Sequence, residues 1–263
     1  MDVYGRYTST SVLQEEEEAT LTAWSIGYFR RKILPHLPSN KDAAILDVGC
    51  GYGRYVKALA DSQYTNVVGV DLSVEQVAFA TAKLGLDNVF QADALAFLDG
   101  KECVYDAVLL MDVLEHLELH QSLKLTSLVW TSLKRGGVLV VQVPNALAPL
   151  APYRYDDITH QRAYTRHSIV QTLLLGGFRP ADITCLDVAP YVHNAWSFAR
   201  WVAWTLALRP MVAAFAGLAY GTGTRGIYTA NMLAIARKES VPWTGQRSQP
   251  YCHVNALEQN RRA

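Results

Sequence analysis

The sequence has no surplus of charge of either sign. Lys and Arg number 24 and Asp and Glu number 24 among 263 residues, so the formal net charge at pH 7 is zero. A protein dedicated to nucleic acid usually carries a clear basic excess, and we therefore expect no nucleic-acid partner. Charged residues make up only 18% of the chain and hydrophobic residues 50%. This balance excludes disorder as the main state.

Cysteine is scarce, and no two cysteines form a C-x-x-C pair. Their spacing matches no zinc site. Residues 1–14 contain no apolar run of the kind that forms the core of a signal peptide. We therefore expect a cytoplasmic protein without disulfide bonds. The four cysteines are Cys50, Cys103, Cys185 and Cys252.

The sequence also lacks an uninterrupted hydrophobic run of membrane-spanning length. An apolar segment covers about residues 190–226, but Arg200 and Arg209 interrupt it. Its longest uncharged stretch, Pro210–Thr224, has 15 residues, fewer than the roughly 20 that a spanning helix needs. We therefore predict that this segment does not cross a membrane.

Two interpretations of this apolar segment stay open. Trp196, Trp201 and Trp204 suit a bilayer surface, which would place the protein at the inner face of a membrane. However, Arg200 and Arg209 lie roughly 180° apart around a helix and cannot share one basic face. We favour a pair of helices that covers the acceptor pocket or forms a homodimer interface. Peripheral membrane contact is the alternative.

Short apolar runs alternate with helical patterns between residues 41 and 238, which we take as one domain. This alternation predicts an α/β fold, a Rossmann-like doubly wound sheet covered on both faces. Residues 1–40 form an N-terminal cap with a helix over Val12–Leu34, and residues 239–263 form a polar tail. The expected strands are Ala43–Val48, Asn66–Val70, Val89–Ala92, Ala107–Met111, Val138–Val143, Phe178–Val188 and Ala230–Arg237. The expected helices between them are Arg54–Asp61, Val74–Leu84, Gln121–Leu133 and Ser168–Leu175.

A glycine-rich turn follows the first expected strand. Residues 46–53 read LDVGCGYG, with glycines spaced G-x-G-x-G. Glycine permits a positive φ and lets a ligand lie against the backbone. The dinucleotide fingerprint G-x-G-x-x-G needs a third glycine at position 54, where this chain has Arg54. The turn therefore disfavours a nicotinamide dehydrogenase.

Two aspartates stand at the ends of the next two expected strands. Asp71 closes the second strand, and Asp93 follows the third. Either one alone is more simply explained as the N-cap of the following helix. In a doubly wound sheet, however, ligands bind at the carboxyl ends of the strands. Together, the two carboxylates indicate a nucleoside, with Asp71 accepting from the ribose hydroxyls and Asp93 from the adenine amine.

Five segments carry a family resemblance: LDVGCGYG at 46–53, GVDLS at 69–73, QADAL at 91–95, YDAVLLMDVLEHL at 105–117 and LKRGGVLVVQVPN at 133–145. The chain resembles class I S-adenosylmethionine-dependent methyltransferases, and in pattern the small-molecule and glycan-cluster methyltransferases and the quinone O-methyltransferases. The resemblance implies seven strands with the last one antiparallel, and a helical insertion between strands six and seven. It also implies S-adenosylmethionine as cofactor and S-adenosylhomocysteine as product. The implied cofactor residues are Asp47, Gly49, Cys50, Gly51, Gly53, Asp71, Leu72, Asp93, Ala94 and Met111.

Three potential metal ligands follow the fourth expected strand. Asp112, Glu115 and His116 have the i, i+3, i+4 spacing that places side chains on one face of a helix. One interpretation is a divalent cation such as Mg²⁺ that orients a hydroxyl acceptor, as the resemblance to quinone O-methyltransferases implies. The other is that Glu115 and His116 only cap the helix and shape the site. We favour the second and predict no metal, because one turn supplies only three ligands.

His160 begins the segment HQRAYT at 160–165. It resembles the H-x-R-x-(Y/F)-(T/S) segment of methyltransferases from polysaccharide clusters, with Thr165 as a helix N-cap. We expect His160, and secondarily His116, to take a proton from an acceptor hydroxyl. The alternative is a histidine that only bonds the loop backbone.

The function that these patterns favour is O-methylation of a hydroxyl on a sugar or a glycosylated acceptor. The alternatives are a quinone or phenol O-methyltransferase and an N-methyltransferase acting on a small amine. A non-catalytic cofactor-binding scaffold is the remote alternative.

Overall fold

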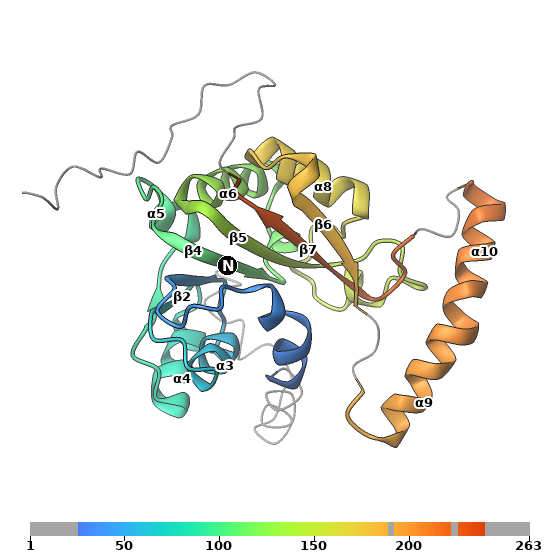
Figure 1. Cartoon of the computed structure of the whole chain (residues 1–263), viewed down its shortest axis with the longest axis horizontal. Helices are drawn as coiled ribbons and strands as arrows, with labels where there is room; N and C mark the ends of the chain where they lie inside the picture. The colour runs from blue at the N-terminus through green and yellow to red at the C-terminus, as the bar shows by residue number, and fades with distance from the viewer. Residues whose placement is uncertain (1–25, 189–191, 222–225, 240–263) are drawn as a thin grey trace, which may run out of the picture.

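The computed structural model describes residues 26–188, 192–221 and 226–239. Seven strands form one sheet in the order β3-β2-β1-β4-β5-β7-β6 (Figure 1). β7 pairs antiparallel with both of its neighbours, and the other pairs are parallel. The predicted fold class is confirmed. The strands are β1 Ile45–Val48, β2 Val67–Asp71, β3 Val89–Gln91, β4 Tyr105–Met111, β5 Leu133–Pro144, β6 Ile183–Asp187 and β7 Asn231–Arg237.

Helices cover both faces of this sheet (Figure 1). One face packs against residues 26–33 and the helices α3 and α4, and the other against α5, α6 and α8. The helices are α3 Arg54–Asp61, α4 Val74–Leu84, α5 Ala94–Leu98, α6 Leu119–Ser132, α7 Pro152–Tyr155, α8 Arg166–Gly176, α9 Ala195–Ala203 and α10 Arg209–Tyr220. Shorter turns are η1 Leu34–His36, η2 Leu114–His116, η3 Pro180–Asp182 and the π-helical η4 Trp204–Leu208.

The strand order places a ligand crevice between β1 and β4. From β1 the chain winds outward through β2 to β3, and it then returns to the other side of β1 with β4. At such a switch point the two connections leave in opposite directions and open a crevice outside the carboxyl ends of the strands. Residues 49–53 after β1 and residues 112–116 after β4 therefore border the candidate site.

Several predicted boundaries are corrected. α3 and α4 have the predicted limits. β5 starts at Leu133, because that residue pairs with Tyr105 before a register shift. Gly136 and Gly137, which follow Leu133, therefore lie inside the strand. β6 starts only at Ile183, because Pro180–Asp182 form a 3₁₀ turn. The first part of the predicted N-terminal helix, residues 12–25, and the tail residues 240–263 lie outside the described residues.

Two of the four cysteines are free among the described residues. They are Cys50, which is buried, and Cys185, which is partly buried.

The apolar insertion is one helix rather than the predicted pair. α9, η4 and α10 run without a break from Ala195 to Tyr220. Pro210 removes one backbone donor, and the π-helical turn directly before it accommodates the interruption. Over Ala195–Ala219 this helix is long and apolar enough to cross a membrane by length and composition. The helix continues through both of its arginines, so it is longer than the uncharged stretch of 15 residues, and the prediction that it is too short to span was wrong.

Candidate functional site

The glycine turn after β1 is tightly packed on one side and open on the other. Gly49 and Gly51 have φ values of 67° and 57°, in the left-handed region that favours glycine. A Cβ on Gly49 would lie 2.5 Å from Cγ2 of Val113. A Cβ on Gly51 would meet only Oε1 of Gln76, at 3.6 Å. Space for a ligand therefore lies beside Gly51, while Gly49 is needed for the turn to pack.

We expect Gly49→Ala to destabilise the protein more than Gly85→Ala does. Gly85 also has a positive φ of 64°, but a Cβ there would meet nothing within 4 Å. Gly85→Ala is expected to cost about 1–2 kcal/mol for the backbone alone, and Gly49→Ala about 1–3 kcal/mol more for the clash. The free energies of unfolding from urea titrations check this. Equal losses would contradict the packing assigned to Gly49.

Asp71, at the end of β2, is held against this turn. Its Oδ2 accepts from the Gly51 N–H at 2.7 Å, and its Oδ1 accepts from the Ser73 N–H at 2.8 Å. Burial raises the pKa of Asp71, and the backbone N–H groups of Ser73, Gly51 and Leu72 partly oppose that rise. The N-cap of α4 is Ser73 and not Asp71. Asp71 therefore presents its carboxylate at the open side of the turn.

Asp93 does cap a helix. Its Oδ1 accepts from the Ala96 N–H at 2.9 Å and begins α5. This confirms the simple explanation for Asp93, while its contact with adenine stays a prediction.

The other predicted cofactor residues lie after the same strands. Leu72 follows Asp71 and is exposed, Ala94 opens α5, and Met111 is the buried last residue of β4. Cys50 faces inward, because a Cβ on Gly69 of β2 would lie 2.9 Å from its Sγ. The side chain of Cys50 therefore packs between the glycine turn and β2.

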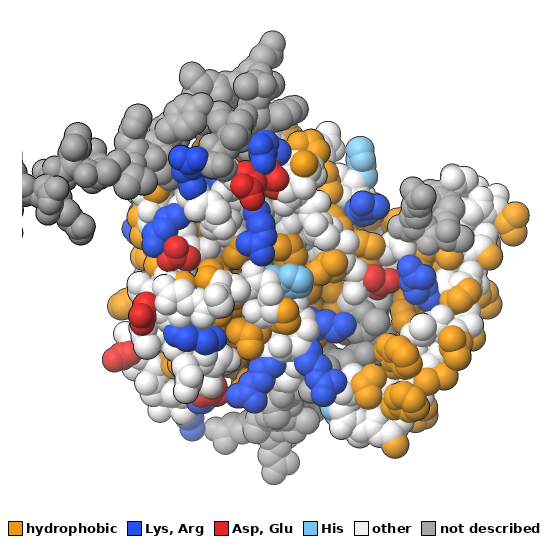
Figure 2. Space-filling view, viewed as in Figure 1, with side chains coloured by type: hydrophobic (Ala, Val, Ile, Leu, Met, Phe, Trp, Pro, Cys, Tyr) orange, Lys and Arg blue, Asp and Glu red, His pale blue; other side chains and the backbone are white. Residues whose placement is uncertain are grey.

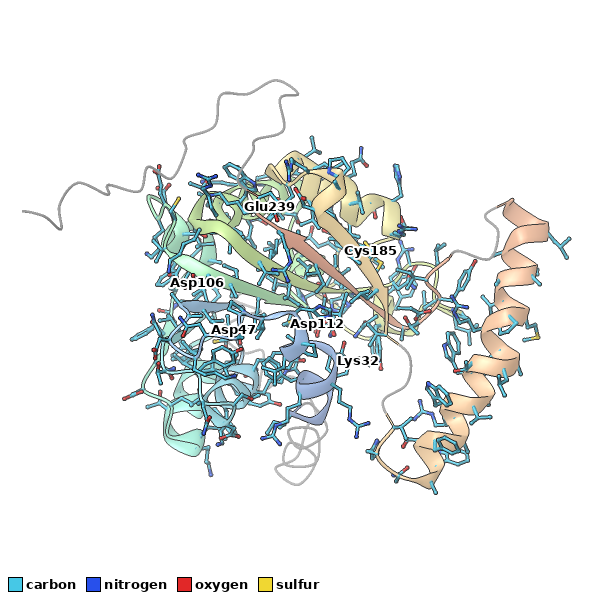
Figure 3. All side chains as sticks on the ribbon, in the orientation of Figure 1. Lys32, Asp47, Asp106, Asp112, Cys185 and Glu239 are labelled. Carbon is cyan, nitrogen blue, oxygen red and sulfur yellow. The ribbon has the colours of Figure 1, made fainter. Side chains whose placement is uncertain are left out.

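Asp47 is a fully buried carboxylate inside β1 (Figure 3). Among the described residues, neither of its oxygens has a hydrogen-bond partner. Burial raises the pKa of Asp47 to about 7, while Arg54 lowers it and Asp71 raises it further. A buried carboxylate without a partner is costly, so it marks a place for a cationic ligand group. The ammonium group of S-adenosylmethionine fits this requirement. Oε1 of Gln76 is also buried without a partner beside the turn.

The pKa of Asp47 predicts a pH-dependent stability. The folded pKa of about 7 lies above the ordinary 3.8, so the folded state holds the proton more tightly. The stabilisation from the Asp47 proton is then fully present below about pH 4 and is lost between about pH 4 and pH 7. This loss lowers the free energy of unfolding by up to about 4 kcal/mol. We expect Asp47→Asn to remove this part of the fall, and Asp61→Asn, on the surface of α3, to leave it. Urea titrations from pH 4 to 8 measure it, and parallel curves for wild type and Asp47→Asn would contradict it.

Asp112 belongs to a polar network and not to a metal-binding helical turn. It follows β4 with a φ of 60°, outside the helical region. Both of its oxygens accept from Nε2 of Gln142, at 2.9 and 2.8 Å, and Arg54 lies 3.6 Å away. The Tyr28 hydroxyl donates to Oε1 of Gln142 at 2.6 Å. The one-face argument for Asp112, Glu115 and His116 was therefore wrong, because the chain turns before η2 begins.

Sequence reasoning missed Gln142 and Tyr28. Gln142 was recognisable, since it is the one polar residue in the apolar run Val138–Val143. Tyr28 gave no comparable signal, because its contact joins residues 114 positions apart.

The loop after β5 is bound to η2 by hydrogen bonds. The Gln161 N–H donates to the Glu115 carbonyl at 2.8 Å, and Nε2 of Gln161 donates to the His116 carbonyl at 3.1 Å. The Tyr164 hydroxyl donates to the Leu114 carbonyl at 3.2 Å. These bonds bring His160 beside His116, with ring centroids 4.6 Å apart.

Thr165 begins α8 as the predicted N-cap, since its Oγ1 accepts from the Ser168 N–H at 3.1 Å. Glu115 and His116, in contrast, do not cap α6, whose N-cap is Glu118.

The hydrogen bonds of the two histidines define their ring orientation. The Thr159 hydroxyl donates to Asp157 at 2.6 Å, so it accepts from Nδ1 of His116 at 2.7 Å. Nδ1 of His160 donates to the Tyr153 carbonyl at 2.7 Å. In the neutral rings Nε2 then carries the lone pair that accepts a proton. Burial and the neighbouring His160 lower the pKa of His116 to about 4.

Glu115 completes a cluster of three possible ligands. Its side chain is fully buried, and neither oxygen has a hydrogen-bond partner among the described residues. Burial, followed by the charge of Asp112, raises the pKa of Glu115. One ligand atom each from Glu115, His116 and His160 lie within 4.8 Å of one another. His160 thus takes the place that the sequence analysis gave to Asp112.

Fold and site together define a class I S-adenosylmethionine-dependent methyltransferase domain. The crevice, the open backbone at Gly51 and the carboxylates of Asp47 and Asp71 fit S-adenosylmethionine as its cofactor. Residues 23–191 match the family described as Methyltransferase domain, and this chain belongs to that family.

Known relatives and structures agree with this membership. The chain is 31% identical over 125 residues to a tRNA U34 carboxymethyltransferase of Haemophilus ducreyi, covering 46% of this chain and 38% of that protein. It is 30% identical over 132 residues to a trans-aconitate 2-methyltransferase of Azoarcus, covering 50% of this chain and 47% of that protein. The chain thus spans less than half the length of both. A solved S-adenosylmethionine-dependent methyltransferase of Archaeoglobus fulgidus has a TM-score of 0.61 at 21% identity, over 82% of this chain and 94% of that one.

Proposed function

We propose that the protein transfers the methyl group of S-adenosylmethionine to a hydroxyl group of a sugar or glycosylated acceptor. The His116–His160 pair beside the crevice supports a hydroxyl acceptor, because each ring offers Nε2 as a proton acceptor. The resemblance of residues 160–165 to methyltransferases of polysaccharide clusters supports a sugar. The similarity to trans-aconitate 2-methyltransferase supports a small-molecule acceptor more generally.

The residues of the chain bind the cofactor, orient the acceptor and remove one proton from the acceptor. Asp71 accepts from the ribose hydroxyls, Asp93 with Ala94 contacts the adenine, and Asp47 faces the ammonium group. The cofactor supplies an electrophilic methyl group, so the protein mainly has to align the acceptor oxygen with it. With the cofactor bound, an oxygen–carbon bond would form as its sulfur–carbon bond breaks, and Nε2 of His160 would take the hydroxyl proton. Burial lowers the pKa of His116 to about 4, which makes this imidazole a weak base.

Methyl-labelled S-adenosylmethionine tests this function in a crude extract of the source organism. Label in a product that a glycosidase converts to a methylated sugar supports the proposal. Label in a quinone, a phenol or an amine overturns the sugar acceptor. Cofactor binding with no labelled product in any fraction would favour the scaffold and overturn the activity itself.

A metal-assisted quinone or phenol O-methyltransferase is the second candidate. The convergence of Glu115, His116 and His160 within 4.8 Å favours it. Two imidazoles and one carboxylate suit Zn²⁺, Mn²⁺ or Fe²⁺ better than Mg²⁺, which prefers oxygen ligands. Loss of activity with a chelator, and its return with one of these ions, would establish this candidate. Activity that a chelator does not change supports the metal-free base.

A further inference from the structure

The insertion helix exposes apolar side chains along its length. Only 11% of its most apolar window is buried in the protein, and Ala213 and Ala216 pack against Tyr228. Figure 1 shows the helix standing apart from the sheet for most of its length. An ordinary surface helix presents a polar face to water, and this one does not. Figure 2 shows the hydrophobic side chains following the helix. The exposed ones are Trp196, Phe198, Trp201, Leu206, Leu208, Met211, Phe215 and Leu218.

Every charged residue within the segment that holds this helix is basic. Residues 188–230 contain three arginines and neither Asp nor Glu, in a chain whose net charge is zero. Arg200 is an exposed residue of α9, and Arg30 is an exposed residue of the helical segment 26–32. Arg31 donates to the Val192 carbonyl at 3.1 Å, which places residues 26–32 beside the start of the helix. An anionic surface complements this arrangement.

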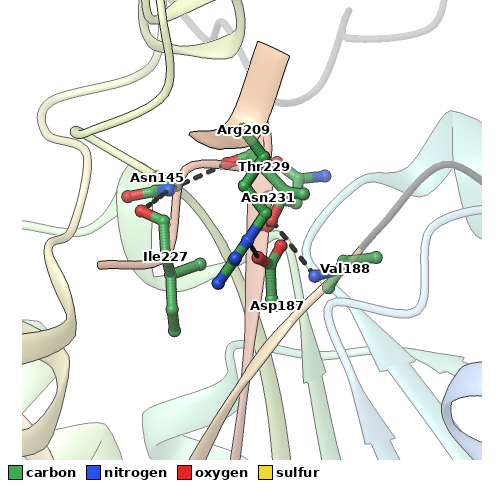
Figure 4. A network of polar contacts seen from close by, with 7 residues as sticks. All are labelled: Asn145, Asp187, Val188, Arg209, Ile227, Thr229 and Asn231. Atoms are coloured by element: carbon green, nitrogen blue, oxygen red, sulfur yellow. Dashed lines mark hydrogen bonds and ion pairs between the residues drawn. The ribbon is translucent and has the colours of Figure 1, made fainter. Parts of the chain in front are cut away.

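The helix rises from the edge of the sheet that carries the acceptor site. β5 and β6 both pair antiparallel with β7, so β6 runs parallel to β5 and ends on the edge where β1 and β4 end. Arg209 of the helix lies 3.1 Å from Asp187, the last residue of β6. Figure 4 shows this ion pair beside the hydrogen bonds from Asn145, which follows β5, to the carbonyls of Ile227 and Thr229. The ion pair therefore attaches the helix to the acceptor edge, which is the edge of the sheet where β1, β4, β5 and β6 end.

The same topology prevents the helix from crossing a membrane. At 25 residues it is about 37 Å long, enough to span the hydrocarbon core. Both of its ends, however, lead back to adjacent strands of one sheet, and ten residues separate Tyr220 from β7. A single crossing would force these ten residues back through the lipid, and ten residues are too few to form a second spanning helix. A helix so connected lies in the plane of the membrane surface.

We propose that the helix Ala195–Ala219 lies in the surface of an anionic lipid bilayer and holds the acceptor edge against it. The loop after β5, at the same edge, adds Leu150 and Ile158, which are 98% and 97% exposed. A methyltransferase held in this way receives its acceptor from the membrane. The proposed sugar is therefore the head of a lipid-linked molecule. The membrane contact does not depend on the proposed function, and only the identity of the acceptor rests on it.

Vesicle co-sedimentation of the full chain, without cofactor or acceptor, tests the contact. We expect binding to vesicles with 30% phosphatidylglycerol, and at least tenfold weaker binding to phosphatidylcholine alone. The triple variant Trp201→Ser, Leu206→Ser, Leu218→Ser is expected to lose binding at least tenfold. Arg30→Gln and Arg200→Gln should each weaken it about fivefold. Leu175→Ser removes a comparably exposed leucine from the end of α8, which leads to the opposite edge, and should change nothing.

Two results would overturn the proposal. One is equal recovery of wild type and the triple variant with the anionic vesicles. The other is a dimer in light scattering that the triple variant dissociates and that binds no vesicles, since the helix would then be an interface between two copies. Retained S-adenosylmethionine binding shows that the variants are folded. Because vesicle binding needs no methyl transfer, its failure and the failure of the proposed function are separate results.

Discussion

His160→Asn is expected to lower the turnover number by about 100-fold or more, which is the usual contribution of a general base. The asparagine amide keeps a donor near the position of Nδ1, which holds the ring against the Tyr153 carbonyl at 2.7 Å. It removes Nε2, the atom that accepts the proton. Steady-state kinetics with the acceptor identified from labelling measure the effect, and the affinity for S-adenosylmethionine should stay unchanged.

His120→Asn is the matched control for this experiment. His120 is exposed and pairs with Glu118 at 3.2 Å, so its loss should leave turnover at the wild-type level. Near-normal turnover of His160→Asn would contradict the base role. Together with an amine product, it would identify an N-methyltransferase, because the lone pair of a neutral amine attacks without a base.

Asp71→Ala is expected to weaken S-adenosylmethionine binding about 10- to 100-fold. Hydrogen bonds to a charged group contribute about 1.5–3 kcal/mol, and the ribose hydroxyls would lose their acceptor. The same change releases the Gly51 N–H, which donates to Oδ2 at 2.7 Å, so the turn that borders the cofactor loses its support as well.

Calorimetric titration measures this affinity, and Asp61→Ala provides the control. Asp61 lies on α3, where it pairs with Lys57 at 2.9 Å, away from the turn. Its loss should leave cofactor affinity unchanged. An unchanged affinity in Asp71→Ala would show that the ribose lies elsewhere. Urea titrations of both variants separate lost affinity from lost stability.

The proposed cofactor half of the site was predicted from the sequence by itself. The glycine turn follows β1, Asp71 ends β2 and Asp93 comes two residues after β3, and the carboxyl ends of parallel strands meet at one edge. Such signals are local, because each one joins residues that are neighbours in the chain. Caps and turns are local too, and this is why the limits of α3 and α4 and the N-cap Thr165 agree with the prediction.

The acceptor half was decided only by the tertiary structure. His160 meets His116 across 44 positions of sequence, and Asp112 turns away to join Arg54 and Gln142. The spacing of Asp112, Glu115 and His116 suggested a ligand set only if one helix held all three, and the left-handed φ of Asp112 prevents that. A period read from sequence assumes regular backbone, so it fails where the chain turns.

The apolar insertion shows the same difference between local signals and contacts that are distant in sequence. Its composition predicted an apolar helical segment, which is a local property. That the segment forms one helix, and that both ends return to the acceptor edge, depends on the pairing of β6 and β7. The sequence by itself therefore predicted the groups that we propose for cofactor binding. The tertiary structure decided which distant groups share the acceptor site and which surface faces outward, because these depend on contacts between elements far apart in the chain.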